Sequence, residues 1–171
     1  MSTRAHDQAE LEKRLWKEIG KARYGMLGVV GCVPAHHFQP MAAFCEPEND
    51  QIWFFSRNDT DLAGMVEQGA DAMFMIQAKD QDFQACVHGR LAQRPDRARM
   101  DRYWNAVVSA WCPEGKDDAR MTLLRLDVSD AQVWLSEANP LAFAFQIGKA
   151  NLTHREPNLG ESRVLDIGTP T

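Results

Sequence analysis

The sequence predicts a mainly β protein, in which an antiparallel barrel of six strands carries helices at its periphery. At least six segments are rich in β-forming residues, whereas only a few have helical periodicity. The turns between the strands are too short for the crossover connections that parallel strands need. Closure into a barrel removes the exposed edges that a sheet of this size would otherwise carry.

The first elements form an amphipathic helix and an antiparallel meander. Leu11, Leu15 and Ile19 make an apolar stripe at a spacing of four, which predicts a helix over residues 7–21 that lies on the core. Three strands joined by tight turns follow, at residues 24–33, 39–46 and 52–56. This arrangement favours a sheet that grows by neighbouring antiparallel pairs.

The middle of the chain contains a short helix and two further strands. Asn58, Asp59 or Thr60 caps a helix that runs to about residue 68, and a strand follows at 71–77. Residues 83–94 alternate between apolar and polar side chains, as a strand with one buried face does. Gly89 within this strand indicates a bulge or a close backbone approach.

The last elements complete a domain over residues 1–150. One helix begins at Pro95. Two strands follow at 121–128 and 131–136, joined by a turn at Ser129 and Asp130. Asn139 and Pro140 then begin a helix that runs to about residue 149. Residues 151–171 are polar and contain several prolines and glycines, so we expect a loosely ordered tail.

The composition limits the classes of partner that the protein could bind. The 171 residues are 44% hydrophobic and 25% charged, which is typical of a soluble globular protein. A formal net charge of −5 argues against nucleic acid or an anionic membrane as the partner, and leaves small molecules and proteins. The charged first turns and the lack of an 18-residue apolar run predict a cytoplasmic protein. The four cysteines are widely spaced, so we expect no metal site.

Residues 39–64 have the pattern of a site for a phosphate-bearing ligand. Hydroxyl side chains gather where the strand at 52–56 ends, and the first amides of the following helix have no partner within it and attract anions. The nearest basic residue is Arg57, in the loop before the helix. The segment therefore has the shape of a phosphate site but little positive charge.

Four motifs follow one another along the chain: Pro40-Met41, the I-W-F-F-S run ending at Ser56 and followed by Thr60, Val87-His88-Gly89, and the W-C-P-E-G-K-D-D loop at 111–118. In this order they resemble the motifs of the pyridoxamine 5′-phosphate oxidase-like split barrels, most closely the bacterial general stress protein branch. Val133-Trp134 is similar to the closing strand of that branch.

The resemblance implies a split barrel that forms a homodimer, with FMN bound in clefts at the subunit interface. It also implies a flavin-dependent oxidoreductase, although no catalytic side chain is identified. The positions that correspond to cofactor-binding residues of the family are Gln39, Pro40, Met41, Phe55, Ser56, Thr60, Leu62, Gln84 and Trp111.

Two of these positions depart from the family pattern. Gln39 replaces the arginine and Leu62 replaces the lysine that hold the FMN phosphate, so Arg57 or an arginine of the partner would have to compensate. Loss of two charge-assisted hydrogen bonds weakens binding by about 10²–10⁴-fold. Two hypotheses stay open: an FMN-dependent oxidoreductase, and a dimeric binding or stress-response module in which flavin binding is weakened or lost. Ser56 and Thr60 would then be only a strand end and a helix cap.

Overall fold

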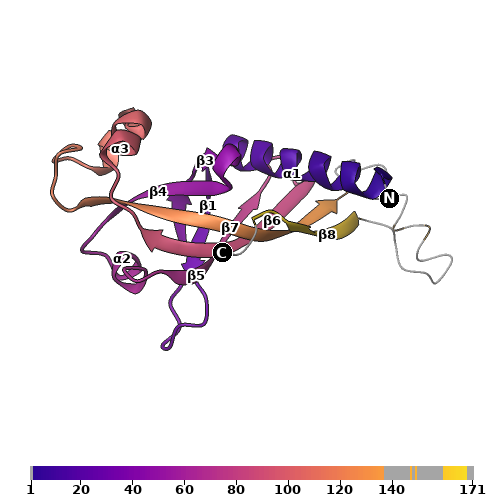
Figure 1. The fold of residues 1–171 in the computed structure, drawn as a ribbon, viewed down its shortest axis with the longest axis horizontal. Coiled ribbons are helices and arrows are strands. Elements are labelled where there is room, and N and C mark those ends of the chain that lie inside the picture. The colour runs from indigo at the N-terminus through magenta and orange to yellow at the C-terminus, as the bar shows by residue number, and fades with distance from the viewer. Residues whose placement is uncertain (1, 137–146, 148, 150–159, 169–171) are drawn as a thin grey trace.

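A computed structural model describes residues 2–136, 147, 149 and 160–168, and its main feature is one antiparallel sheet (Figure 1). The strands are β1 (Tyr24–Val29), β2 (Gln39–Ala42), β3 (Phe44–Glu46), β4 (Gln51–Arg57), β5 (Ala70–Gln77), β6 (Phe83–Gln93), β7 (Met121–Ser136) and β8 (Gly160–Asp166). The helices are α1 (Ser2–Ala22), the 3₁₀ turn η1 (Pro47–Asn49), α2 (Asp61–Met65), α3 (Arg97–Tyr103) and α4 (Ala106–Trp111).

One bent segment closes the sheet into a barrel. The strand order is β2-β1-β5-β6-β7-β4-β3, so β2 and β3 lie at opposite ends of the order although only Ala43 separates them in the chain. The amide of Ala43 donates to the carbonyl of Arg23 (2.7 Å), which fixes the bend. This arrangement confirms the predicted split barrel, and the described residues form eight strands rather than six.

The predicted pair of closing strands is wrong, because β7 is one continuous strand. Ser129 and Asp130 contact β6 instead of turning the chain: the Ser129 hydroxyl lies 3.2 Å from the His88 carbonyl oxygen, and the Asp130 carboxylate lies 2.9 Å from His88 Nδ1. The register shifts between His88 and Gly89, as predicted. A Cβ on Gly89 would lie 2.1 Å from the Asp127 carbonyl oxygen, so the close approach requires glycine.

The core lies between α1 and the inner face of the barrel. Leu15 and Ile19 are buried against residues such as Leu27, Phe54 and Phe74 from β1, β4 and β5. The predicted apolar stripe is confirmed, and the helix begins at Ser2 rather than at residue 7. Figure 1 shows α1 lying along one side of the sheet.

The helix predicted from Pro95 is two helices. Asp96 caps α3, and Asn105 caps α4 because its side-chain oxygen accepts from the amides of Val107 (2.9 Å) and Val108 (3.1 Å). The break at Trp104 and Asn105 changes the direction of the chain. It places α4 beside β2 and the end of β4.

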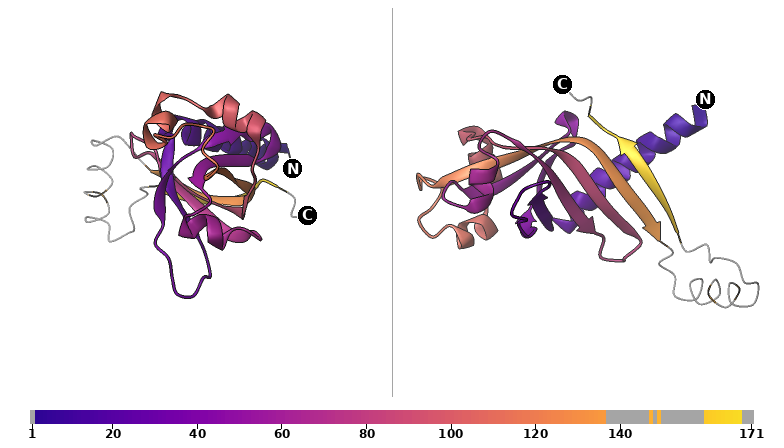
Figure 2. Two further views of the ribbon diagram at one scale, coloured as in Figure 1. Left: turned by 90° about the vertical axis from the view of Figure 1, so that its left-hand side faces the viewer. Right: turned by 90° about the horizontal axis from the view of Figure 1, so that it is seen from below.

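Part of the predicted tail is a strand. Residues 160–166 form β8, which pairs with residues 130–136 of β7, and Leu165 is only 2% exposed. Figure 2 shows β8 passing beside α1, where Gln8 donates to the Asp166 carbonyl (3.4 Å). Most of the helix predicted from Asn139 falls outside the described residues. Among those described, no helix has the length and apolar character needed to cross a bilayer, and the cytoplasmic location stays a prediction.

Candidate functional site

A pocket of about 520 Å³ lies between β2, the end of β4 and α4. Its volume is within the range of about 300–1,000 Å³ that is typical of small-molecule sites. Seven of the nine predicted cofactor-binding residues line it: Gln39, Pro40, Met41, Phe55, Ser56, Thr60 and Trp111. The structure therefore brings together residues that are separated by up to 72 positions in the sequence, from Gln39 to Trp111.

Most of the pocket wall is apolar. Met41 comes from β2 and Phe55 from β4, and Phe44 packs edge-to-face on Phe55 with 5.5 Å between ring centroids. Val107 and Trp111 come from α4, and Trp111 is 82% exposed. Such a wall suits the faces of a planar aromatic ligand.

Hydroxyl groups form the polar end of the pocket. Ser56 Oγ and Thr60 Oγ1 lie 3.3 Å apart. The Thr60 hydroxyl donates to the Arg57 carbonyl (2.8 Å) and accepts from the Ala63 amide (3.2 Å), which confirms Thr60 as the helix cap. Because Thr60 is already occupied, the Ser56 hydroxyl is the more available donor. The helix that follows has only five residues, so its N-terminus attracts an anion less strongly than the sequence predicted.

Arg57 supplies the positive charge at this end. Of the described residues that line the pocket, it is the only one with a charged side chain. Its guanidinium pairs with the Asp59 carboxylate through Nε–Oδ1 (2.9 Å) and through Nη2–Oδ2. The hydrogen bond raises the pKa of Arg57 and lowers the pKa of Asp59. Arg57 is thus half-exposed and neutralised by a carboxylate two residues away.

Two predicted site residues lie elsewhere. Leu62 is 5% exposed and packs in the main core, because it lies on the inward side of α2. Gln84 lies on β6, where its amide nitrogen donates to the Gln81 carbonyl (2.8 Å) and its oxygen accepts from Ser136 (3.2 Å). Neither side chain lines the pocket within one chain.

Several lining residues were not predicted. They are Tyr24, Ala42, Phe44, Val107, Val108, Cys112 and Met121, whereas Arg57 was expected as a substitute for the missing charge at the phosphate. Val107 falls on the single helix that the sequence predicted from Pro95. Asn105, a residue strongly preferred at helix starts, was the signal that a second helix begins there and can face another surface.

A buried carboxylate supports one wall of the pocket. Glu46 is 1% exposed and accepts from Arg99, from the Tyr103 hydroxyl and from Asn49 (3.0 Å). The Arg99 hydrogen bonds are the main reason that the pKa of Glu46 falls to about 2. The Tyr103 ring stacks on Phe44 with 4.9 Å between centroids. The network therefore holds α3 and the Phe44 wall in place.

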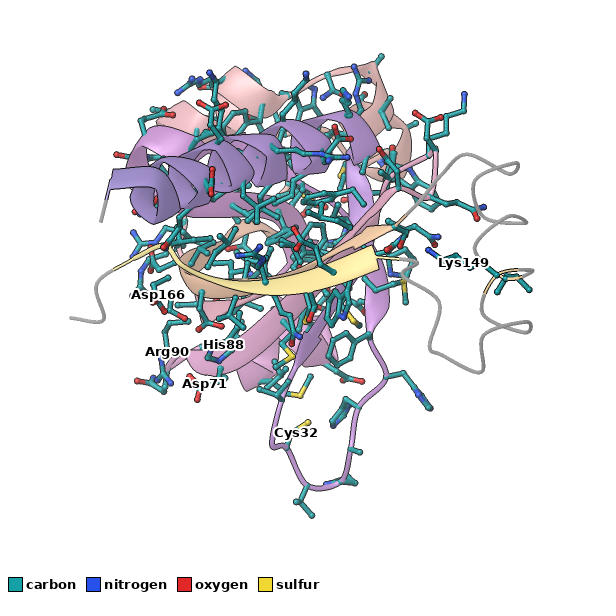
Figure 3. The ribbon with its side chains drawn as sticks, turned by 90° about the vertical axis from the view of Figure 1, so that its right-hand side faces the viewer. Cys32, Asp71, His88, Arg90, Lys149 and Asp166 are labelled. Atoms are coloured by element: carbon teal, nitrogen blue, oxygen red, sulfur yellow. The ribbon has the colours of Figure 1, made fainter. Side chains whose placement is uncertain are left out.

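Other hollows and charged clusters contain fewer features of a ligand site. A hollow of about 840 Å³ between α1 and β8 is lined largely by exposed side chains of both charges and by no aromatic residue. On the outer sheet face, Arg90 pairs with Asp71 (3.5 Å) and His88 with Asp130 (2.9 Å), and Figure 3 shows Asp71, His88 and Arg90 near one another. Within the described part of the chain, no group of His, Cys, Asp and Glu side chains is arranged to hold a metal ion.

A family described as pyridoxamine 5′-phosphate oxidase like matches residues 10–158. No match was found among curated proteins. The family match covers β1 to β7 and every residue that lines the pocket.

Solved structures show the same similarity over most of the chain. A candidate general stress protein 26 from Jannaschia sp. CCS1 is 28% identical, with a TM-score of 0.73, over 93% of this chain and 99% of that one. The general stress FMN/FAD binding protein of Xanthomonas citri is 39% identical, with a TM-score of 0.70, over 77% of this chain and 92% of that one. A candidate general stress family protein from Xanthomonas campestris pv. campestris is also 39% identical, with a TM-score of 0.69, over 77% and 90% of the two chains.

Proposed function

The chain belongs to the pyridoxamine 5′-phosphate oxidase-like family, in its general stress protein branch, and we propose that it binds FMN as a flavin-dependent oxidoreductase. One observation carries the proposal: a single pocket joins apolar walls to two hydroxyls and one arginine. A flavin has a planar ring at one end and a phosphate at the other, so the two parts of the pocket match the two parts of the ligand.

The residues present fit this cofactor in kind. Met41, Phe55 and Trp111 would contact the ring, while Ser56 and Arg57 would bind the phosphate. When bound, the flavin supplies the hydride or electron transfer, and the protein supplies binding, orientation and exclusion of water. For this reason the proposal requires no acid or base side chain at the pocket.

We infer a homodimer with the ligand at the subunit interface. Met26 of β1 and Met75 of β5 are neighbours across the sheet, and each is 39% exposed. Trp134 on β7 is exposed to the same extent. A second copy on this face would bury these side chains, as an interface rich in Met and Trp does. Light scattering tests the proposal, and a monomer at micromolar concentration would contradict it.

The alternative is a split-barrel binding or stress-response module with weakened or lost flavin binding. Its specific support is the shortage of charge, since Gln39 carries none and Leu62 is buried in the core. Arg57, already paired with Asp59, would be the sole cation at the phosphate among the described residues that line the pocket.

An FMN titration separates the two functions. We expect micromolar saturation, with quenching of tryptophan fluorescence because Trp111 lines the pocket, and a shift in the visible absorbance of the flavin. Riboflavin, which lacks the phosphate, is the matched control and should bind more weakly. The absence of FMN binding at millimolar concentration would overturn the flavin proposal and favour the binding module.

A further inference from the structure

A second hollow lies beside the pocket, toward the junction of α1 and β1. Its volume is about 660 Å³. It shares five lining residues with the first pocket, Tyr24, Ala42, Phe44, Val107 and Val108. The shared residues make the two hollows direct neighbours on the surface. Ser56, Arg57 and Thr60 line only the first of them, so the second hollow extends away from the phosphate end.

Arg23 gives this second hollow its charge. Of the described residues that line it, Arg23 is the only one with a charged side chain, and none is a carboxylate. The Arg23 side chain is exposed and makes no hydrogen bond or ion pair with the described residues. Two neighbouring polar side chains are already used, since the Tyr103 hydroxyl donates to Glu46 and Asn105 caps α4, whereas the exposed Tyr24 has no hydrogen bond to another described residue through its hydroxyl. An incoming anion would therefore meet one free guanidinium and no competing carboxylate.

The backbone holds Arg23 in a conformation that arginine seldom adopts. Its φ is 60°, in the left-handed region that glycine and asparagine favour at the end of a helix. The Arg23 amide donates to the Ile19 carbonyl (3.0 Å), and its carbonyl accepts from the Ala43 amide (2.7 Å). The end of α1 and the bend between β2 and β3 thus fix the main chain on both sides. The main chain of Arg23 is therefore fixed, while its side chain stays exposed and unpaired among the described residues beside the hollow.

We propose that the second hollow is a subsite for an organic anion, an apolar body carrying a carboxylate that pairs with Arg23. Phe44 and Val107 would contact the apolar body on the walls that the two hollows share. Because the subsite lies next to the pocket assigned to FMN and shares a wall with it, its occupant would be the substrate of that site. This last identification rests on the proposed function, whereas the anion subsite itself rests on Arg23 and the second hollow.

Two probes of equal shape test whether the charge of Arg23 recognises a carboxylate. 2-Naphthoate carries a carboxylate, and 2-naphthamide is its neutral counterpart, so we measure the affinity of both by calorimetry in FMN-saturated protein. Arg23→Asn should weaken 2-naphthoate about tenfold and leave 2-naphthamide and FMN unchanged, because one charge-assisted contact is lost. Asparagine tolerates the left-handed conformation, so this variant should fold.

Gln81→Asn is the matched control. Gln81 also has a positive φ, 59°, but lies in the turn between β5 and β6 and lines neither hollow. The Gln81→Asn variant should bind both probes as the wild type does. Failure of the wild type to bind 2-naphthoate at millimolar concentration, or an equal loss of both probes in Arg23→Asn, would overturn the subsite. If FMN does not bind, the proposed function fails and the titrations are run without FMN. The change in 2-naphthoate affinity caused by Arg23→Asn then still decides whether the subsite exists.

Discussion

The carboxylate of Glu46 and the guanidinium of Arg99 form a two-pronged ion pair, with Nε–Oε1 and Nη2–Oε2 each 3.0 Å long. Glu46 belongs to β3 and Arg99 to α3, so this pair joins the closing segment of the barrel to the helices beside the pocket. Arg99 also lies over the Trp53 ring, 4.5 Å from its centroid. The pair is therefore the main polar attachment of α3 to the sheet.

Glu46→Gln should destabilise the fold. The neutral amide keeps the size of the side chain but loses charge-assisted hydrogen bonds from Arg99 and offers one acceptor oxygen instead of two. We expect the free energy of unfolding to fall by about 1.5–3 kcal/mol. Urea denaturation followed by tryptophan fluorescence measures it. Glu48→Gln, an exposed change in the adjoining turn, is the control and should have an effect of less than about 0.5 kcal/mol.

Stability should also depend on Glu46 at acid pH. Its pKa is about 2 in the folded protein, below its ordinary value of 4.5, so the stabilisation is complete above pH 4.5. It is lost as the pH falls from 4.5 through 2, because the carboxylate must then be protonated. The difference corresponds to about 3 kcal/mol. Urea midpoints between pH 6 and pH 2 should fall less in Glu46→Gln than in the wild type, and parallel curves would show that Glu46 does not contribute.

The positions of most strands along the chain were predictable from the sequence, whereas their order in the sheet and the ends of the sheet were not. Strict alternation marked β6 because one of its faces is buried and the other is exposed. β7 was divided because Ser129 and Asp130 are common turn residues, and only the bulge beside His88 shows why the chain stays extended. β8 exposes most of its side chains and buries only Leu165, so it has no apolar pattern to detect.

The part of the candidate site that lies on strands was predictable from the sequence. Residues 39–41 and 55–56 keep their positions relative to one another because β2 and β4 are regular. Leu62 was assigned from the family motif alone, and α2, with only five residues, carries no periodic signal to indicate that this side chain faces the core. Arg23 gave no signal, since its importance comes from a backbone angle and from the lack of a partner among the described residues.

Arg57 should decide whether the phosphate is recognised. Arg57→Gln removes the only charged side chain of the described pocket lining, so we expect FMN affinity to fall about tenfold and riboflavin affinity to stay unchanged. Asp59→Asn should tighten FMN, because Asp59 neutralises the guanidinium. Fluorescence titrations measure both affinities.

Arg163→Gln is the control for these changes. Arg163 also pairs with a carboxylate two residues away, Glu161, and is similarly exposed, but it lies on β8 and does not line the pocket. Flavin affinities in this variant should equal those of the wild type. An equal loss of FMN and riboflavin in Arg57→Gln would mean that Arg57 shapes the pocket and does not bind the phosphate.

Gln39 and Leu62 should respond differently when the family's charged residues are restored. Gln39 lines the pocket and is exposed, with only a weak contact to the Met41 sulfur (3.7 Å), so an arginine fits there without burial. Gln39→Arg should tighten FMN about tenfold without affecting riboflavin. Leu62 packs in the core, so Leu62→Lys must expel its ammonium group toward solvent and should lower the free energy of unfolding by about 1–3 kcal/mol. FMN titration and urea denaturation give the FMN affinity and the free energy of unfolding of each single variant. Tighter FMN binding in Leu62→Lys without loss of stability would contradict the buried position, because it would show that α2 turns this residue toward the phosphate.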